Sequence, residues 1–328
     1  MKILWLTENV WSAMMNSNGN VSVSGPNEEI IQNKHNDYDS KEEKIMPLVT
    51  SKEMLLKAQK GGYAVGAFNA ENMEMVKAII QAAEELKAPV MIQTTPSTVK
   101  YGTVETYAAI VAAEAAKASV PVCLHLDHGS SFELAMQAMH AGYTSVMIDG
   151  SKLDFEDNIR ETRRVADVAA ALDIPCEAEL GKVGGKEDDL EAEADTNTDP
   201  QEAKEFVERT GVTSLAVAIG TAHGFYVGTP VLDKERLSEI REVVDIPLVL
   251  HGASGLSDED VSDCVKRGIC KVNFATELRA AYSRAVKETF TENENTIDPK
   301  AYGKKAIQAV KELVEARMKV CGCDGKAE

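Results

Sequence analysis

Eight short apolar runs rich in β-branched residues alternate with longer stretches of helical period between residues 63 and 275. The runs are typical of buried parallel strands, and stretches such as Glu74 to Leu86 and Phe155 to Ala171 have the Ala- and Leu-rich faces of amphipathic helices. Eight strand–helix units predict a closed (β/α)8 barrel of the TIM type, an α/β fold, because eight such units close a parallel sheet on itself. The predicted strands are residues 63–69, 89–95, 120–127, 145–150, 174–180, 214–220, 246–252 and 269–275.

The main structural alternative is an open, doubly wound parallel sheet, which the same alternation can form. A doubly wound sheet that binds a dinucleotide carries a G-x-G-x-x-G turn after its first strand, and no such turn follows residues 63–69. We therefore expect the barrel. One more amphipathic helix is predicted after Asp298, beyond the eighth unit.

Residues 1–45 differ in composition from the rest of the chain, because they are polar, rich in turn-forming residues and without hydrophobic period. We expect a mobile or irregular N-terminal extension there, followed by a single domain at residues 46–328. Met46 opens the stretch MPLVTSKEML, which is typical of a natural start. A hydrophobic fraction of 44% with only 5% aromatic residues suits the helix-rich interior of one large domain.

Composition and charge exclude several functions. The formal net charge of −18 and the lack of long Lys/Arg runs argue against nucleic acid or an anionic membrane as a partner. Apolar runs stay well short of the ~18 residues of a membrane span, and the stretch ILWL after Lys2 is too short for a signal-peptide core. The six cysteines include no C-x-x-C pair, and three lie in strand-like runs. We expect a cytoplasmic protein in a reducing environment.

Polar residues with metal-binding chemistry gather where the predicted strands end. In a TIM barrel the carboxyl ends of the strands meet at one rim, where the chemistry takes place. Three of the six histidines lie at these ends, on different strands, with carboxylates beside them. Three imidazoles with one open position are the composition of a catalytic zinc site. The residues at these strand ends are Asp127, His128, Asp149, Glu177, Glu179, His223, His251 and Asn273.

Asp127 and His128 are neighbours, so a regular strand would point them to opposite faces. We expect Gly129 to resolve this conflict by letting the chain turn after His128, with Asp127 inward and the imidazole on the rim. His125, two residues before Asp127, shares the inward face one layer deeper, where we expect it to pack as a structural residue.

Two stretches predict anion contacts, a glycine-rich one after the seventh strand and one with a threonine after the eighth. They are HGASG at 251–255 and NFAT at 273–276, which lie where TIM barrels commonly bind phosphate through backbone amides and a helix N-terminus. Arg279, one helical turn further, is a candidate for a second phosphate, with a surface ion pair as the alternative. The long loops 181–199 and 221–231, after the fifth and sixth strands, are expected to be functional or lid-like.

The motifs HLDHGSSFE, SVMIDGS, EAELGKVGGKEDD, AVAIGTAHGFY, LVLHGASGL and KVNFATEL, in this order, resemble those of the class II zinc-dependent ketose-bisphosphate aldolases. The resemblance runs from about Met46 to the C-terminus. Within the family, LHGASGL, GTAHGFY, the N-x-A-T-E form at 273–277 and the terminal CGC resemble the tagatose-1,6-bisphosphate branch. Fructose-bisphosphate aldolases tend to have LHGGTG or HGGSG, and Asp or Asn in place of Ala275.

The resemblance implies the roles of individual residues. Zinc would be held by His128, His223 and His251, and Asp127 would exchange the proton of the substrate's C4 hydroxyl. Asp149 and Glu179 match positions linked to a second metal site or its surroundings, and Glu187 matches a carboxylate proposed to move a proton at the enediolate carbon. Asn69 and Thr95 are weaker candidates. The residues that would hold the dihydroxyacetone phosphate half are Gly224, Gly252, Ala253, Ser254, Asn273, Phe274, Ala275 and Thr276.

The resemblance also implies reversible cleavage of tagatose 1,6-bisphosphate to dihydroxyacetone phosphate and glyceraldehyde 3-phosphate. It implies a homodimer or homotetramer, and it allows a second divalent or a monovalent cation and an accessory aldolase subunit. Fructose 1,6-bisphosphate is the alternative substrate, and a noncatalytic barrel subunit is a further alternative. A lysine Schiff base is disfavoured because the sixth strand lacks lysine and Lys271 lies early in its strand. A zinc hydrolase is disfavoured because the first strand ends in AFN, without H-x-H.

Overall fold

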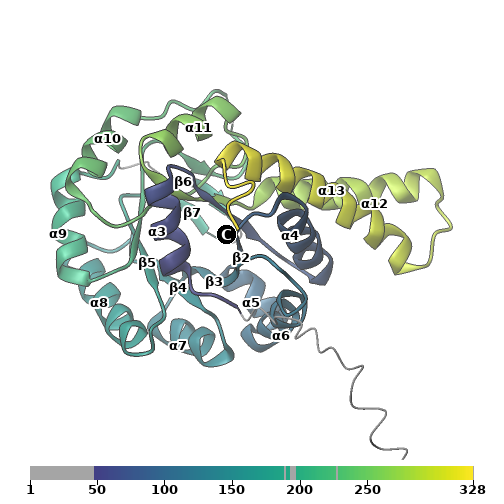
Figure 1. Cartoon of the computed structure of the whole chain (residues 1–328), viewed down its shortest axis with the longest axis horizontal. Helices are drawn as coiled ribbons and strands as arrows, with labels where there is room; N and C mark the ends of the chain where they lie inside the picture. Colours follow the sequence, from purple (N-terminus) through teal and green to yellow (C-terminus); the bar gives the residue numbers. More distant parts are fainter. Residues whose placement is uncertain (1–47, 188–189, 193–196, 227, 328) are drawn as a thin grey trace, which may run out of the picture. The chain divides into compact units, whose positions relative to one another are not determined.

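The computed structural model describes residues 48–187, 190–192, 197–226 and 228–327. Its main feature is a closed barrel of parallel strands, in the order β1, β11, β10, β8, β5, β4, β3, β2, which confirms the predicted (β/α)8 fold (Figure 1). The barrel strands are β1 Val65–Asn69, β2 Val90–Thr94, β3 Val122–Gly129, β4 Ser145–Ile148, β5 Cys176–Leu180, β8 Ser214–Val217, β10 Leu248–Leu250 and β11 Ile269–Phe274.

Each barrel strand lies within the range predicted for it, except that β3 continues two residues further, to Gly129. The sequence pattern succeeded because strands buried on both faces form continuous apolar runs. The difference at β3 has a local cause, since its register against β4 shifts between Leu126 and Gly129. This irregularity falls on the two residues that were expected to carry the chemistry.

Helices surround the barrel, and two further helices, α12 and α13, pack against each other beside it (Figure 1). Most begin at a side-chain cap; for example, Asn72 accepts a hydrogen bond from Met75 N at the start of α4. The predicted C-terminal helix is α13. The helices are α3 Ser51–Gly61, α4 Met73–Leu86, α5 Pro96–Gly102, α6 Val104–Ala115, α7 Phe132–Ala141, α8 Phe155–Ala171, α9 Pro200–Thr210, α10 Lys234–Val243, α11 Asp258–Lys266, α12 Thr276–Glu292 and α13 Pro299–Cys321.

Helix α3 covers the amino end of the barrel (Figure 1). Just before the helix, Val49 N donates a hydrogen bond to Val122 O at the start of β3. Ser51, the first residue of α3, hydrogen-bonds the hydroxyl of Ser145, the first residue of β4, over 2.8 Å. This end of the barrel is therefore covered, opposite to the end where the strands finish.

The two long loops predicted to be functional form a small second sheet. Strands β6 Gly184–Glu187 and β7 Leu190–Ala192 pair antiparallel, and β9 Ala222–His223 joins β6 in parallel. The close pairing of Gly185 with His223 requires a glycine, because a Cβ on Gly185 would lie 2.3 Å from the carbonyl oxygen of His223. The loop after β5 therefore supports the loop that carries one of the predicted metal ligands.

The interior of the barrel is unusually polar. TIM-barrel interiors are commonly filled by branched aliphatic residues. Here Gln93, His125 and Ser145 stand in register on β2, β3 and β4, and Glu177 and Lys271 enter from β5 and β11. All five are buried. Burying so many polar groups is costly unless they are paired, so their partners matter for the function of the site.

Several predictions concern other parts of the chain. The predicted extension at residues 1–45 lies outside the described residues, and the division at residue 45 stays a prediction. All six cysteines are buried and unbridged, as expected for thiols that act as small apolar groups. Among the described helices, none combines the length and apolar character needed to cross a bilayer.

Candidate active site

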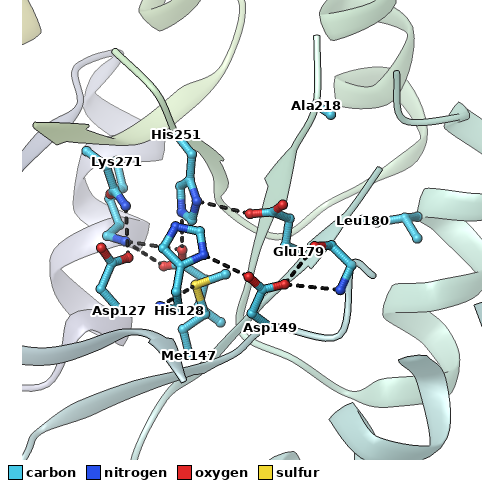
Figure 2. Close-up of polar contacts among 12 residues, drawn as sticks. Asp127, His128, Met147, Asp149, Glu179, Leu180, Ala218, His251 and Lys271 are labelled. Carbon is cyan, nitrogen blue, oxygen red and sulfur yellow. Dashed lines mark hydrogen bonds and ion pairs between the residues drawn. The ribbon is translucent and has the colours of Figure 1, made fainter. Parts of the chain in front are cut away.

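Three imidazoles converge at the carboxyl end of the barrel, and two of them, His128 and His251, are labelled in Figure 2. His128 is the last residue but one of β3, His223 lies on β9 and His251 directly follows β10. The His128 ring centroid lies 5.0 Å from that of His223 and 4.7 Å from that of His251. One nitrogen from each ring lies within 4.8 Å of the other two. Residues far apart in the sequence, from His128 to His251, thus form one cluster, as the strand-end rule predicts.

The backbone of His128 explains how Asp127 and His128 both take part in the site. His128 has a left-handed conformation, with φ of 48°, which breaks the alternation of the strand. The expectation that the chain turns at Gly129 was therefore wrong, because the strained residue is the histidine itself. Gly129 is needed for a different reason, since a Cβ there would lie 2.2 Å from the carbonyl oxygen of Met147.

Carboxylates hold the outer nitrogens of the rings. His128 donates from Nδ1 to Oδ2 of Asp149 over 2.8 Å, and Asp149 also accepts two hydrogen bonds from Ser151. Burial alone would raise the pKa of Asp149, but His128 and Ser151 hold it well below its usual range. Asp149 therefore stays ionised and fixes the orientation of the His128 ring.

His251 lies between two glutamates of β5. Its Nε2 lies 3.0 Å from Oε1 of Glu177, and its Nδ1 lies 3.1 Å from Oε2 of Glu179. Burial would lower the pKa of His251, but the two carboxylates raise it to about 9. Surroundings that favour an imidazolium so strongly also favour a bound cation in place of its proton.

Asp127 lies between two amides at the same rim. Asn69 Nδ2 donates to Oδ2 over 2.9 Å, and Asn273 Nδ2 donates to Oδ1 over 3.0 Å. Gln93 in turn donates to the amide oxygen of Asn69. Burial would raise the pKa of Asp127, but nearby His128 and Lys271 outweigh burial and lower it to about 2. Asp127 is thus a fully buried carboxylate that remains able to accept a proton.

Beneath this rim, Glu177 joins several buried groups. Lys271 Nζ donates to both of its oxygens, over 3.1 and 2.9 Å. His125 Nε2 lies 3.7 Å from Oε2 of Glu177, and its Nδ1 lies 2.7 Å from the hydroxyl of Ser145. Burial, followed by the charge of Lys271, lowers the pKa of His125 to about 3. His125 is a packed interior residue, in line with its predicted structural role.

The predicted phosphate loops lie together at the ends of β10 and β11. Gly252 has φ of 66°, and a Cβ on it would lie 2.6 Å from the carbonyl oxygen of Ala222. Ser254 Oγ accepts a hydrogen bond from Ala275 N over 3.3 Å. Helix α12 begins at Thr276 without a side-chain cap, so its first amides can serve an anion.

The remaining predicted site residues make different contacts in the structure. Arg279 Nε donates to Oε1 of Glu71 over 2.8 Å, which is the ion pair considered as the alternative to phosphate binding. The Phe274 ring stacks on Phe68 in the core, so only its backbone can serve a ligand. Thr95 caps α5. The side chain of Glu187, at the end of β6, lies outside the described residues, and its predicted role stays a prediction.

Three residues that contact the site were not among the predicted site residues. Gln93 supports Asn69, and Tyr226 donates from its hydroxyl to Gly252 O over 2.7 Å and accepts from Ala222 N over 2.9 Å. Lys271 was set aside as distant from the rim, but its long side chain reaches Glu177 inside the barrel. A lysine within the apolar run ICKVNFA was the sequence signal for this last role.

The donor set fits a divalent metal ion. Three buried or half-buried imidazoles with an open position suit zinc. Among the described residues, His251 Nδ1 and Glu179 Oε2 are buried without a hydrogen bond although they lie 3.1 Å apart. Two such atoms facing one position are expected where a cation binds both. His128, Asp149 and Glu179 form a second, overlapping group of the same kind.

Comparison with known proteins agrees with the fold and gives the family. The profile of the family described as "Fructose-bisphosphate aldolase class-II" matches residues 49–326. The chain therefore belongs to the class II fructose-bisphosphate aldolase family, whose members are metal-dependent lyases of phosphorylated sugars.

Solved structures give the same result. The YdjI aldolase from Escherichia coli K12 is 40% identical, with a TM-score of 0.76 over 86% of this chain and 100% of that protein. A putative fructose-1,6-bisphosphate aldolase from Coccidioides immitis is 33% identical, with a TM-score of 0.77 over 84% of this chain and 96% of its own. The fructose-bisphosphate aldolase of Campylobacter jejuni, 21% identical, shares the fold with a TM-score of 0.73, over 85% of this chain and 97% of its own.

Proposed function

We propose that this chain is a zinc-dependent aldolase that reversibly cleaves D-tagatose 1,6-bisphosphate to dihydroxyacetone phosphate and glyceraldehyde 3-phosphate. The observation that carries the proposal is the convergence of His128, His223 and His251 beside the buried carboxylate of Asp127. Three imidazoles favour zinc over magnesium or calcium, which prefer oxygen ligands.

Different residues of the chain are proposed to serve different steps of the reaction. Zinc, when held by the three histidines, supplies the positive charge that draws electrons from the substrate's ketone. Asp127 is proposed to accept the proton of the C4 hydroxyl as the C3–C4 bond breaks. Asn69 and Asn273, which donate to its two oxygens, support this role by holding the carboxylate in position. In the reverse direction Asp127 returns the proton. Glu187 is proposed to move the proton at C3.

The anion contacts supply binding and orientation. The amides of Gly252, Ala253 and Ser254, and those at the start of α12, are proposed to hold the phosphate of the dihydroxyacetone half. Gly224, Asn273 and the backbone from Phe274 to Thr276 complete this half of the pocket. The acidic chain, with its net charge of −18, gives no general attraction for an anionic sugar, so these local donors must provide it.

Fructose 1,6-bisphosphate is the second candidate substrate. It differs from tagatose 1,6-bisphosphate in configuration at C4, the carbon whose hydroxyl Asp127 would serve. The family's description and the name of the Coccidioides immitis protein favour fructose, whereas Ala275 and the LHGASGL motif favour tagatose. A noncatalytic barrel subunit is disfavoured because such a chain has no need to retain the whole set of histidines with Asp127.

The deciding experiment measures triose phosphate release by the purified protein from both ketose bisphosphates, before and after chelation. We expect activity on tagatose 1,6-bisphosphate that chelator removes and zinc restores. Activity that survives chelation and becomes trapped by borohydride would indicate a Schiff base and overturn the proposal. Faster turnover of fructose 1,6-bisphosphate would overturn the choice of substrate and leave the metal chemistry intact.

Assembly and location stay predictions. A homodimer or homotetramer, a possible accessory subunit and a cytoplasmic location rest on the family resemblance and on composition. Sedimentation of the purified protein, alone and with such a subunit, would test the first two.

A further inference from the structure

Glu177 and Lys271 form a charged pair across the inside of the barrel. Glu177 lies on β5 and Lys271 on β11, two strands that are separated in the barrel by β8 and β10. Both side chains are essentially inaccessible to solvent, with Lys271 at 0% and Glu177 at 1%. The ammonium contacts both carboxylate oxygens. The pair therefore crosses the interior and does not link neighbouring strands.

Stability does not account for this pair. Removing two charges from water costs several kcal/mol per ion, and replacing a buried ion pair by packed apolar residues is often neutral or stabilising. Branched aliphatic side chains fill the same position in most TIM barrels. A buried Glu–Lys pair at this place is thus expected to serve the site above it.

The contact that links the pair to the site is the one with His251. Oε1 of Glu177 lies 3.0 Å from Nε2 of the imidazole. An ionised carboxylate can only accept a hydrogen bond, so this contact places a proton on Nε2. The lone pair of the neutral ring is then on Nδ1, the nitrogen that faces Glu179 and the metal position.

We propose that Glu177 is a positioning residue that fixes Nδ1 of His251 as the metal-binding nitrogen, and that Lys271 holds the Glu177 carboxylate in place to do so. The inference rests on the proposed metal site. It assigns a role at that site to a buried pair of residues that is not proposed to contact the substrate. Lys271 also keeps Glu177 from turning upward to bind the ion itself, because both carboxylate oxygens are occupied by its ammonium group.

The change Glu177→Gln tests the hydrogen-bond direction. Lys271 can only donate, so it will take the amide oxygen and leave the amide NH2 facing Nε2 of His251. The ring must then carry its proton on Nδ1, where it blocks metal binding. We expect the dissociation constant for zinc, measured by competition with a chromophoric chelator, to rise about 10- to 100-fold.

A second variant separates positioning from folding. Glu177→Leu/Lys271→Met removes both charges together, so no unpaired ion remains in the barrel. We expect this double variant to unfold at a denaturant concentration similar to or above that of the wild type, yet to bind zinc about 10- to 100-fold more weakly. Glu277→Gln, which weakens a half-buried ion pair with Arg317 outside the barrel, is the matched control and should keep wild-type zinc affinity.

A spectroscopic measurement identifies the nitrogen directly. In wild-type protein with ¹⁵N-labelled histidine and bound ¹¹³Cd²⁺, the metal should couple to Nδ1 of His251, and in Glu177→Gln this coupling should move or vanish. If the double variant binds zinc as tightly as the wild type, or cadmium couples to Nε2 in the wild type, this inference alone is overturned. If wild type and control bind no metal, the proposed function fails together with it.

Discussion

Nδ1 of His128 donates to Asp149 over 2.8 Å, from a residue whose backbone is in the left-handed region. A histidine in this conformation costs of order 1–3 kcal/mol, so other contacts must hold it. The hydrogen bond to Asp149 is one of these contacts, and it also leaves Nε2 as the nitrogen directed at the metal position.

We predict that Asp149→Asn weakens zinc binding by about 10- to 100-fold. The amide can turn its NH2 group toward Nδ1 of His128, and it then no longer accepts the hydrogen bond that fixes the orientation of the imidazole ring. The measurement is a zinc titration against a competing chelator. Asp154→Asn, on the exposed start of α8 and without a side-chain cap bond, is the control and should bind zinc normally. Equal affinities in the two variants would show that Asp149 has no part in orienting His128.

Asp127→Ala is predicted to fold and bind zinc but to lose turnover. General acid–base catalysis by a positioned side chain contributes about 10²- to 10⁴-fold, and a fall in kcat of that size is expected. The assay compares kcat on the preferred ketose bisphosphate with zinc content in the same sample. Wild-type turnover by a zinc-loaded Asp127→Ala protein would remove the role assigned to Asp127.

Much of this arrangement could be predicted from sequence. The strands were found because each is a buried apolar run, and Asp127, His128 and His251 were found because polar residues that end such runs must meet at one rim. The left-handed turn at His128 could not be placed, because several local conformations satisfy the pattern DHG. The contact of Lys271 with Glu177 could not be predicted, because the reach of a long side chain across a barrel depends on strand tilt and register, which the order of residues does not specify.

Gly129→Ala tests the tight packing next to Asp127 and His128. Its Cβ would lie 2.2 Å from the carbonyl oxygen of Met147, which belongs to the barrel backbone and cannot move cheaply. We predict a loss of about 1–3 kcal/mol in the free energy of unfolding, measured by urea denaturation. Gly303→Ala in α13, where a Cβ finds no atom nearer than 3.6 Å, should instead stabilise by about 0.5–1 kcal/mol. A neutral Gly129→Ala would contradict the close approach.

Tyr226→Phe should weaken binding of the phosphate on the dihydroxyacetone half of the substrate. The hydroxyl links Gly252 O and Ala222 N, and so connects the phosphate loop to the loop that carries His223. Loss of two hydrogen bonds worth about 0.5–1.5 kcal/mol each predicts a rise in KM of roughly 10-fold. Tyr143→Phe, which removes a hydroxyl bonded to Thr94 in the barrel wall, should lower stability but leave KM unchanged. A KM that changes equally in both variants would point to general loosening.

Arg279 and Glu71 offer a test of where the second phosphate of the substrate binds. Arg279 was a candidate for a second phosphate, with a surface ion pair as the alternative, and in the structure its Nε is paired with Glu71, whose other oxygen accepts from Thr98. A substrate phosphate would have to compete with that carboxylate for the guanidinium group. Glu71→Gln weakens the competitor, so we predict a lower KM for the ketose 1,6-bisphosphate.

Arg279→Met is predicted to act in the opposite direction. A charge-assisted hydrogen bond is worth about 1.5–3 kcal/mol, so KM for the bisphosphate should rise about 10- to 100-fold. The matched comparison is the corresponding ketose 1-phosphate, which lacks the second phosphate and should show the same KM with both variants and the wild type. If Arg279→Met changes KM for both substrates equally, Arg279 only supports the rim through its ion pair with Glu71, and the second phosphate is bound elsewhere.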